Sequence, residues 1–414
     1  MLKKLYLSGG CFMQRTKCKS SAIFRTAVLL ILIVTVFSSF VFVADGYSGT
    51  ECSENHVLLP KNGMVAELSV SARSAILIEE KSGKVIWSKN ADERLPMAST
   101  TKIMTALVAI ENSDVSEAVE VSPMAVGIEG SSIYLYEKEK LTLEDLLYAL
   151  LLESANDAAA AIAIEIGGSI EGFAEMMNDK ASELGLKDTH FTNPHGLDDA
   201  EHFTTARELA IITKAALENE TFKSIVSTFK KTIPLNETEG VRLLINHNKM
   251  LKSYNGAIGV KTGYTKKSGR CLVSAAERDG VGFICVTLNA PDDWKDHHAL
   301  LDHGFSLYES RIICKADEIN LVQDIVGGTH EYVTVMTDKD ISVILPKSAP
   351  TATATVELFP FTYAPVESGE KLGRIIYKID GKVVAEAPLY ASYAVEMRPV
   401  KLSLWERLLS FLGF

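Results

Sequence analysis

The sequence lacks the motifs that most often mark a metal site, because it contains neither a CxxC pair nor an HExxH motif. It also lacks an excess of positive charge. Its 414 residues carry a formal net charge of −11, whereas nucleic-acid-binding proteins present basic surfaces to the phosphate backbone. It has no internal repeat and no low-complexity linker. We therefore expect no metal, no cofactor and no nucleic-acid partner in a chain long enough for two domains.

Cysteine is scarce, with six residues in the chain. Cys11 and Cys18 precede a long apolar run, and the other four could oxidise in an exported protein. Cys271 and Cys285 flank a predicted turn at Asp279-Gly280, and such a hairpin would place them on opposite faces of a sheet. We therefore expect unpaired buried thiols at these two positions.

No charged residue occurs in residues 26–44, "TAVLLILIVTVFSSFVFVA", which lie directly after a basic N-terminal flank. The run could be the core of a signal peptide or a single membrane span, and the flank directs the downstream chain outward. Ala44 and Gly46 are small enough for cleavage, although Phe42 is a poor −3 residue. We expect residues 1–46 to be a signal peptide or N-terminal membrane segment, and the rest to lie at the outer face of the cytoplasmic membrane.

The C-terminal residues 399–414 have the pattern of an amphipathic helix. It is too short to span a bilayer, so it is predicted to lie in the membrane interface as an anchor. The alternative is a helix packed on its own domain. The apolar face from Lys401 onward comprises Leu404, Trp405, Leu408, Leu409, Phe411 and Leu412.

The pattern between the two ends divides into two regions. Residues 74–88 read as a hairpin, 96–216 are mainly helical, and strands return from 257 before a last helical segment, "WKDHHALLDHGFSLYES". This order predicts one sheet whose first and last strands meet under a cover of helices, in a domain of residues 60–315. Alternating strands with an Asp380-Gly381 turn then predict a small β-rich domain of residues 316–395.

The stretch "LPMASTTKIMTA" places Ser99 and Lys102 three residues apart at the start of a predicted helix. At this spacing the amine can approach the hydroxyl. A buried lysine near a second cation loses proton affinity and can activate a serine as its base. The alternative is a plain helix cap, and the same spacing recurs at Ser227 and Lys230, so this motif alone is weak.

Two further motifs add to it. Ser154 and Asn156 end a strongly apolar helix, where a hydroxyl and an amide need buried partners. Ser154 could bridge two lysines, and Asn156 could hold a substrate amide. The single KTG motif, Lys261-Thr262-Gly263, lies on a predicted strand that could pair with an extended peptide, and its glycine leaves space for a ligand backbone. For an isolated KTG, a strand that ends in a turn is the more frequent case.

In this order the three motifs resemble those of penicillin-recognising serine enzymes. The stretches "LLLESANDAA", "ELGLKDTHFTNPHGLDD", "TTARELA" and "GVKTGYTKKSGRC" extend the resemblance. The chain resembles the low-molecular-mass penicillin-binding proteins that are serine-type D-alanyl-D-alanine carboxypeptidases. The resemblance implies an α/β (α+β) transpeptidase fold like that of penicillin-binding proteins and β-lactamases, an antiparallel sheet covered by helices, plus a small all-β C-terminal domain.

The resemblance also implies the roles of the site residues. Ser99 would be the acylated nucleophile, Lys102 its base and Ser154 a proton relay. Asn156 would hold the substrate, and Lys261 and Thr262, next to Gly263, would bind its terminal carboxylate. The oxyanion hole would consist of the N–H groups of Ser99 and Tyr264, and Arg207 would be structural. The implied partners are peptidoglycan stem peptides ending in D-Ala-D-Ala, β-lactam inhibitors and a membrane surface.

Three alternatives compete with this interpretation. A class A β-lactamase usually carries Ser-Asp-Asn, whereas position 155 is Ala here. A non-catalytic peptidoglycan-binding protein would not require the serine and both lysines together. A zinc peptidase could use Asp296, His297, His298 and His303, but without HExxH a solvated helix face is the preferred account of these residues.

Overall fold

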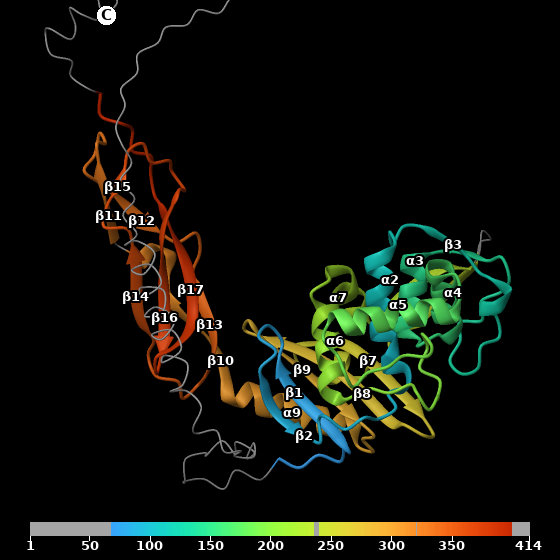
Figure 1. Ribbon diagram of the computed structural model, residues 1–414. Helices are drawn as coiled ribbons and strands as arrows, with labels where there is room; N and C mark the ends of the chain where they lie inside the picture. The colour runs from blue at the N-terminus through green and yellow to red at the C-terminus, as the bar shows by residue number, and fades with distance from the viewer. Residues whose placement is uncertain (1–67, 236–239, 320, 400–414) are drawn as a thin grey trace, which may run out of the picture. The chain divides into compact units, whose positions relative to one another are not determined.

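The computed structural model describes residues 68–235, 240–319 and 321–399. A five-stranded antiparallel sheet with the order β2-β1-β9-β8-β7 lies at the centre of the first domain (Figure 1). Because β1 pairs with β9, early and late strands meet as predicted, and the hairpin predicted at 74–88 is confirmed. The strands are β1 Ser74–Glu79, β2 Val85–Lys89, β7 Ala257–Thr265, β8 Gly269–Arg278 and β9 Val281–Leu288.

Helices and two short ribbons complete this domain. One ribbon pairs β3 (Ala118–Glu120) with β4 (Lys140–Thr142), and the other pairs β5 (Lys230–Leu235) with β6 (Gly240–Ile245). The helices and 3₁₀ turns are η1 Ala98–Thr101, α2 Lys102–Asn112, η2 Pro123–Ala125, α3 Leu143–Leu152, α4 Asn156–Gly167, α5 Ile170–Glu183, α6 Ala206–Leu217, α7 Glu220–Ser227, α8 Met250–Ser253 and α9 Asp293–Leu307.

The inner strands β1, β8 and β9 are buried on both faces of the sheet, which explains why they read as nearly continuous apolar runs. In β1, Ile76 and Ile78 belong to the core beneath the helical block, whereas Ala75 and Leu77 belong to a second core beneath α9. The period of two along a strand produces this division. The antiparallel sheet covered by helices is therefore confirmed.

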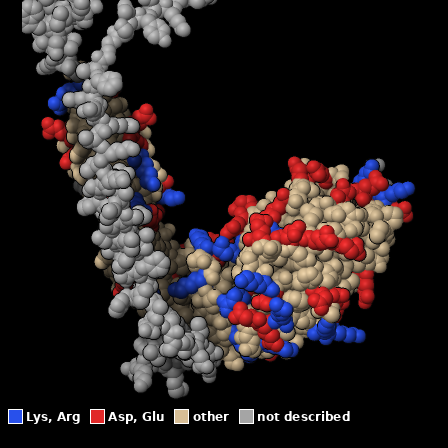
Figure 2. All heavy atoms as spheres, in the orientation of Figure 1, with Lys and Arg blue, Asp and Glu red and all other residues tan. Residues whose placement is uncertain are grey.

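Helix α5 shows how the negative charge is kept at the surface. Its buried side carries Phe173 and Met177, and its exposed side carries Glu171, Glu175 and Asp179 at spacings of four residues. Figure 2 shows this acidic row over α5. The acidic side chains of α5 therefore face solvent while its apolar side chains face the core.

The two cysteines of the β8–β9 hairpin are free, as predicted. Cys271 lies in the core beneath the helical block and Cys285 in the core beneath α9. The turn between their strands falls at Asp279-Gly280. Burial raises the pKa of the Cys271 thiol to about 11, so this thiol is unreactive at neutral pH.

The prediction that the acidic and histidine residues of α9 form a solvated face is wrong for Asp296 and His297, which are both buried. The Asp296 carboxylate accepts hydrogen bonds from Ser71 N at 2.9 Å, Ser71 Oγ at 2.7 Å and Ala72 N at 3.0 Å. His297 Nε2 lies 3.0 Å from Thr287 Oγ1 on β9. These residues attach α9 to the sheet and to the segment before β1.

The C-terminal region is all-β, which confirms the predicted second domain type. Its six-stranded sheet has the order β14-β16-β17-β12-β11-β15, and β10 pairs with β13 in a separate ribbon. The predicted turn at Asp380-Gly381 joins β16 to β17. The strands are β10 Tyr308–Cys314, β11 Leu321–Val326, β12 Tyr332–Met336, β13 Ile341–Pro346, β14 Thr353–Leu358, β15 Thr362–Tyr363, β16 Lys371–Ile379 and β17 Lys382–Ala391, with the 3₁₀ turn η3 Ala316–Glu318.

The predictions for residues 1–46 and 400–414 concern segments outside the described residues. Within the described ranges, no helix has both the length and the apolar character needed to cross a membrane.

Replacing the buried Asp296 by alanine should lower the free energy of unfolding by about 3 kcal/mol, because two backbone N–H groups lose their acceptor inside the protein. Urea denaturation monitored by tryptophan fluorescence measures the change. The matched control is Asp292→Ala at an exposed position four residues earlier, where a change within about 0.5 kcal/mol is expected. Equal losses for both variants would contradict the assignment.

Candidate active site

Ser99 lies in the 3₁₀ turn η1, immediately before α2. The turn is held from within, because Thr100 Oγ1 donates to Met97 O at 2.6 Å and Thr101 Oγ1 donates to Ala98 O at 2.8 Å. Neither η1 nor α2 has a side-chain cap at its N-terminus, so the interpretation of Ser99 as a plain helix cap is wrong. Its hydroxyl remains available for chemistry.

The Lys102 side chain is fully buried and its Nζ has three oxygen neighbours. It lies 2.9 Å from Ser99 Oγ, 2.7 Å from Asn156 Oδ1 and 2.5 Å from the backbone O of His195. Asn156 Oδ1 and the His195 carbonyl can only accept hydrogen bonds. A neutral amine satisfies both with its two N–H groups and keeps its lone pair for the Ser99 hydroxyl, which is the arrangement that a general base requires.

The surroundings of Lys102 favour that neutral form. Burial lowers its pKa well below the ordinary value of 10.5, and the nearby Lys261 ammonium lowers the pKa further. The Asp157 carboxylate acts in the opposite direction. Burial also lowers the pKa of Lys261, to about 7. A charge on the buried Lys261 amine thus raises the cost of charging the buried Lys102 amine.

The KTG motif lies on β7, beside the turn that carries Ser99. A Cβ added at Gly263 would come within 3.1 Å of Met97 O, Ser99 N and Thr100 N. The glycine therefore allows β7 to approach the turn closely. Lys261 is buried, with its Nζ donating to Thr262 O at 2.9 Å, whereas the Tyr264 side chain is 67% exposed. The backbone of β7 and Ser99 are thus brought together.

Ser154 and Asn156 lie where α3 passes into α4. Ser154 is buried and has a left-handed φ of 61°, and Asn156 begins α4. The Asn156 amide is already engaged, because Oδ1 accepts from Lys102 and Nδ2 donates to Glu129 O at 2.5 Å. Among the described residues, no hydrogen bond joins Ser154 to Lys102 or Lys261. The predicted bridge is therefore not seen, and one Asn156 N–H is left for a ligand.

Comparisons with known proteins show the family to which the chain belongs. Residues 61–292 match the family described as D-alanyl-D-alanine carboxypeptidase, Peptidase_S11, and residues 308–397 match the C-terminal domain of penicillin-binding protein 5. The first match covers more than half of the chain. The chain belongs to the D-alanyl-D-alanine carboxypeptidase family. As a member it is a serine peptidase, and the resemblance and the fold class predicted from the sequence are confirmed.

Individual relatives cover most of this carboxypeptidase. D-alanyl-D-alanine carboxypeptidase DacF of Bacillus subtilis is 35% identical over 337 residues, which are 79% of this chain and 86% of the relative. DacC of Escherichia coli is 31% identical and covers 79% of this chain and 85% of its own length. The crystal structure of penicillin binding protein 5 from Haemophilus influenzae matches with a TM-score of 0.61 at 28% identity, over 80% of this chain and 99% of that one.

The competing interpretations lose their structural basis. Ser227 Oγ donates to Ser224 O at 3.0 Å within α7, and Lys230 is exposed at the start of β5, so the second Ser-x-x-Lys is structural. In the part of the chain that the structure describes, no three His, Cys, Asp or Glu side chains could hold a metal ion. Arg207 forms an ion pair with Asp92, and the hydrogen bond from Arg207 lowers the pKa of the Asp92 carboxyl group. This pairing agrees with a structural role for Arg207.

The sequence motifs missed a second set of residues that hold the nucleophile turn. His202 Nε2 lies 2.7 Å from Thr101 Oγ1, and His202 Nδ1 accepts from Thr192 N at 3.0 Å. With Nδ1 as acceptor, the hydrogen is on Nε2 and points to Thr101, which donates in turn to Ala98 O. Burial lowers the pKa of His202 to about 4, so the ring stays neutral at physiological pH. Only the identity of His202 as a titratable residue could have signalled this role.

Gly196 supports the turn from the same loop. It has a φ of 87°, and a Cβ at this position would lie 2.0 Å from Ala98 O. Any other residue would therefore displace the turn that carries Ser99. Ala98 itself has a φ of 49°, a conformation that costs a non-glycine residue about 1–2 kcal/mol. The contacts of Thr101, His202 and Gly196 hold it there.

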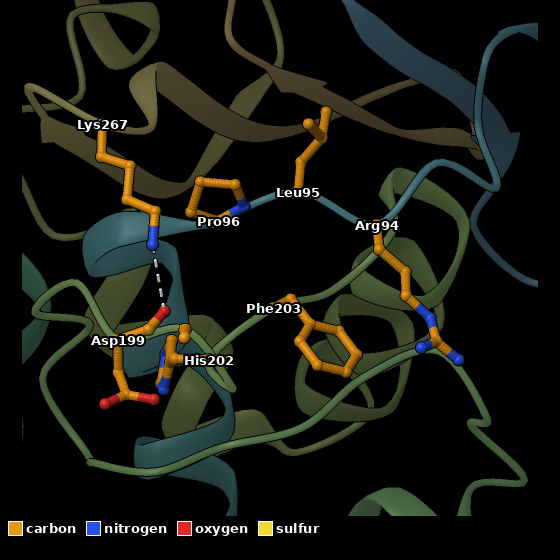
Figure 3. Close-up of a pocket in the computed structure, with 8 residues that line it drawn as sticks. Arg94, Leu95, Pro96, Asp199, His202, Phe203 and Lys267 are labelled. Carbon is orange, nitrogen blue, oxygen red and sulfur yellow. Dashed lines mark hydrogen bonds between the residues drawn. The ribbon is translucent and has the colours of Figure 1, made fainter.

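A pocket of about 210 Å³ borders this support (Figure 3). It contains none of the predicted catalytic residues, but His202 forms part of its wall, and Lys267 reaches across to donate to Asp199 O at 3.3 Å. The lining residues are Arg94, Leu95, Pro96, Asp199, Ala200, His202, Phe203 and Lys267. The pocket therefore adjoins the positioning residues rather than the reacting atoms.

The pH dependence of acylation should move in opposite directions in two variants. Lys261→Met removes a charge that lowers the pKa of Lys102, so the limb on which acylation rises with pH should shift upward. Asp157→Asn removes a charge that raises the pKa, so the same limb should shift downward. Stopped-flow acylation by a chromogenic β-lactam across the pH range measures both. Shifts of the same sign would contradict Lys102 as the titrating base.

His202→Ala should slow acylation about tenfold to a hundredfold by loosening the turn that positions Ser99, with a smaller effect on KM. His202→Gln can still donate toward Thr101 and should recover part of the rate. His298→Ala on α9 serves as the control. A loss confined to KM, or an equal loss in the control, would show that His202 does not position the nucleophile.

Proposed function

We propose that the protein removes the terminal D-alanine from peptidoglycan stem pentapeptides through an acyl-enzyme on Ser99. The observation that carries the proposal is the contact between Lys102 Nζ and Ser99 Oγ at 2.9 Å, with both remaining amine hydrogens directed at obligate acceptors. A serine and lysine in this relation form a nucleophile and its base.

In the first step, Ser99 Oγ attacks the carbonyl carbon of the penultimate D-alanine while Lys102 accepts the hydroxyl proton. The N–H groups of Ser99 and Tyr264 stabilise the developing oxyanion. Ser154 is buried beside the start of α4 and makes no hydrogen bond to Lys102 in the free enzyme, so the bound substrate must join the two before Ser154 passes the proton to the leaving amine. D-alanine then departs. Water then attacks the ester, with Lys102 again as the base, and Ser99 is released.

The substrate is held as a strand beside β7. Main-chain pairing with β7 gives the peptide its direction, and the free Asn156 N–H binds its backbone. Lys261 and Thr262 bind the terminal carboxylate, which pairs with a positive charge and a hydroxyl donor. Gly263 lets β7 approach the turn that carries Ser99, rather than leaving space for a ligand backbone as the sequence predicted, and so brings the bound strand beside the Ser99 hydroxyl. A β-lactam offers the same carboxylate and a strained amide, so it acylates Ser99 as an inhibitor.

The site of action is the outer face of the cytoplasmic membrane. The uncharged run of residues 26–44 behind a basic flank supports export. The apolar face of residues 401–414 supports an interfacial helix as anchor. Both segments lie outside the described residues, so these proposals rest on the sequence.

Incubation with a labelled penicillin and subsequent peptide mapping should place one adduct on Ser99. Ser99→Ala should lose the label entirely, because no other described serine lies beside a buried lysine amine at hydrogen-bond distance. The same variant should release no D-alanine from a stem pentapeptide.

Ser227→Ala is the matched control because it alters the second Ser-x-x-Lys, and it should label like the unaltered protein. Label on Ser227, or normal labelling of Ser99→Ala, would refute the nucleophile. Penicillin labelling of Ser99 without D-alanine release would refute the carboxypeptidase reaction while leaving the nucleophile intact.

A further inference from the structure

Four large apolar side chains lie exposed at one end of the β-domain, and we call this set the aromatic end. They are between 45% and 67% exposed, whereas neighbouring Ile325 and Val395 are buried. Exposure of this kind on adjacent strands marks a contact surface more often than scattered single residues do. The set comprises Val326, Phe361, Tyr363 and Met397.

The strand register explains why these side chains share a face. β11 and β15 are parallel, with Ile325 opposite Thr362 and Val326 opposite Tyr363. Side chains alternate along a strand, so Phe361 lies on the same side as Tyr363 while Thr362 lies with buried Ile325. The rings of Phe361 and Tyr363 meet edge to face, with their centroids 5.4 Å apart. The two rings therefore form one continuous apolar surface with Val326.

The described chain stops at this same end. Met397 forms a bridge with Gly328, and Arg398 N donates to Gly327 O at 2.8 Å, directly beyond Val326 on β11. Figure 1 shows β11, β12 and β15 together at this end of the domain. The next residues, 400–414, are those with the amphipathic pattern. The aromatic end thus adjoins the start of the segment that we propose as an anchor.

We infer that the aromatic end is a second contact of the protein with the lipid surface, and this inference rests on the proposed anchoring by residues 401–414. Aromatic rings partition favourably to the region between headgroups and acyl chains. A short interfacial helix by itself binds a membrane weakly. A second contact in the same chain increases the membrane affinity of the whole protein without changing the affinity of each contact.

Charge does not provide this attraction. The ionisable side chains around the aromatic end include two acids, Asp324 and Glu331, and one base, Arg398. All three are exposed. Acidic groups beside the rings disfavour an anionic surface, so the rings provide the affinity. Contact with zwitterionic vesicles should therefore be at least as strong as contact with anionic vesicles, and nearly independent of salt.

The test measures proximity to lipid directly in the full chain. The protein is reconstituted into phosphatidylcholine vesicles whose acyl chains carry bromine, which quenches tryptophan at contact range. Phe361→Trp places a probe in the aromatic end, and Val383→Trp places one at an equally exposed position at the far end of β17. After subtraction of the parent signal, we expect at least about twofold quenching of the first probe and none of the second.

The outcomes separate this inference from the proposed anchor. Trp405 lies within the anchor segment, so quenching of the parent protein reports the anchor and the added signal reports the aromatic end. An unquenched Phe361→Trp probe in a quenched parent would overturn the inference and leave the anchor standing. A quenched probe in an unquenched parent would support the aromatic end alone.

Two further results would also overturn the inference. Equal quenching of both probes would show that the domain lies on the lipid without using this end. A blue shift of the Phe361→Trp probe that depends on protein concentration and needs no vesicles would show that a second copy of the chain covers the rings instead.

Discussion

The buried amine of Lys102 is the contact on which the rest of the site depends. Its three oxygen neighbours come from η1, from the start of α4 and from the loop that carries His195. A charged amine in this place would be costly unless fully paired, and an amine without acceptors would be costly as well. The helical block and the loop must therefore be assembled around Lys102 before Ser99 has a base.

The need to assemble these elements around Lys102 explains why two residues near the site have positive φ values. Ala98 and Ser154 both have φ values in the left-handed region, at 49° and 61°, although neither is glycine. Such residues persist where neighbouring contacts determine the conformation. Asp157 shows how this is done, because it accepts hydrogen bonds from Ser132 Oγ and Leu135 N and so fixes the loop that holds Asn156. Hydrogen bonds of this kind in the surrounding domain keep the strained backbone of Ala98 and Ser154 in place.

The sequence predicted what periodicity and side-chain chemistry encode. Alternation and turn residues predict the hairpin at 74–88 and the free cysteines, and the order of strands, helices and strands predicts that early and late strands meet. Lys102 beside Ser99 was predicted from a three-residue spacing on one turn. The two hairpins and the contact of Lys102 with Ser99 depend on residues close together in the chain, whereas the pairing of β1 with β9 joins Ser74 to Leu288 and follows only from the order of the elements.

The features that the sequence did not reveal depend on contacts across long distances. The third partner of Lys102 is a backbone carbonyl, and every residue has one, so no motif marks His195 O. Asp296 was expected in solvent because its partner, Ser71, lies 225 residues away. The relation of His202 to Thr101 spans 101 residues. Polar residues in a helix sequence suggest exposure, but they can be buried where distant parts of the chain provide hydrogen-bond partners, as Ser71 does for Asp296.

The most direct test of this account is the titration of Lys102 itself in the free enzyme. With lysine labelled biosynthetically with ¹³C, the Lys102 Cε resonance can be assigned by its loss in Lys102→Arg and monitored by NMR across the pH range. The account predicts a midpoint well below 10.5, because burial and the neighbouring Lys261 charge both disfavour the ammonium. A midpoint near 10.5 would contradict it, because a permanently charged Lys102 could not accept the proton of Ser99.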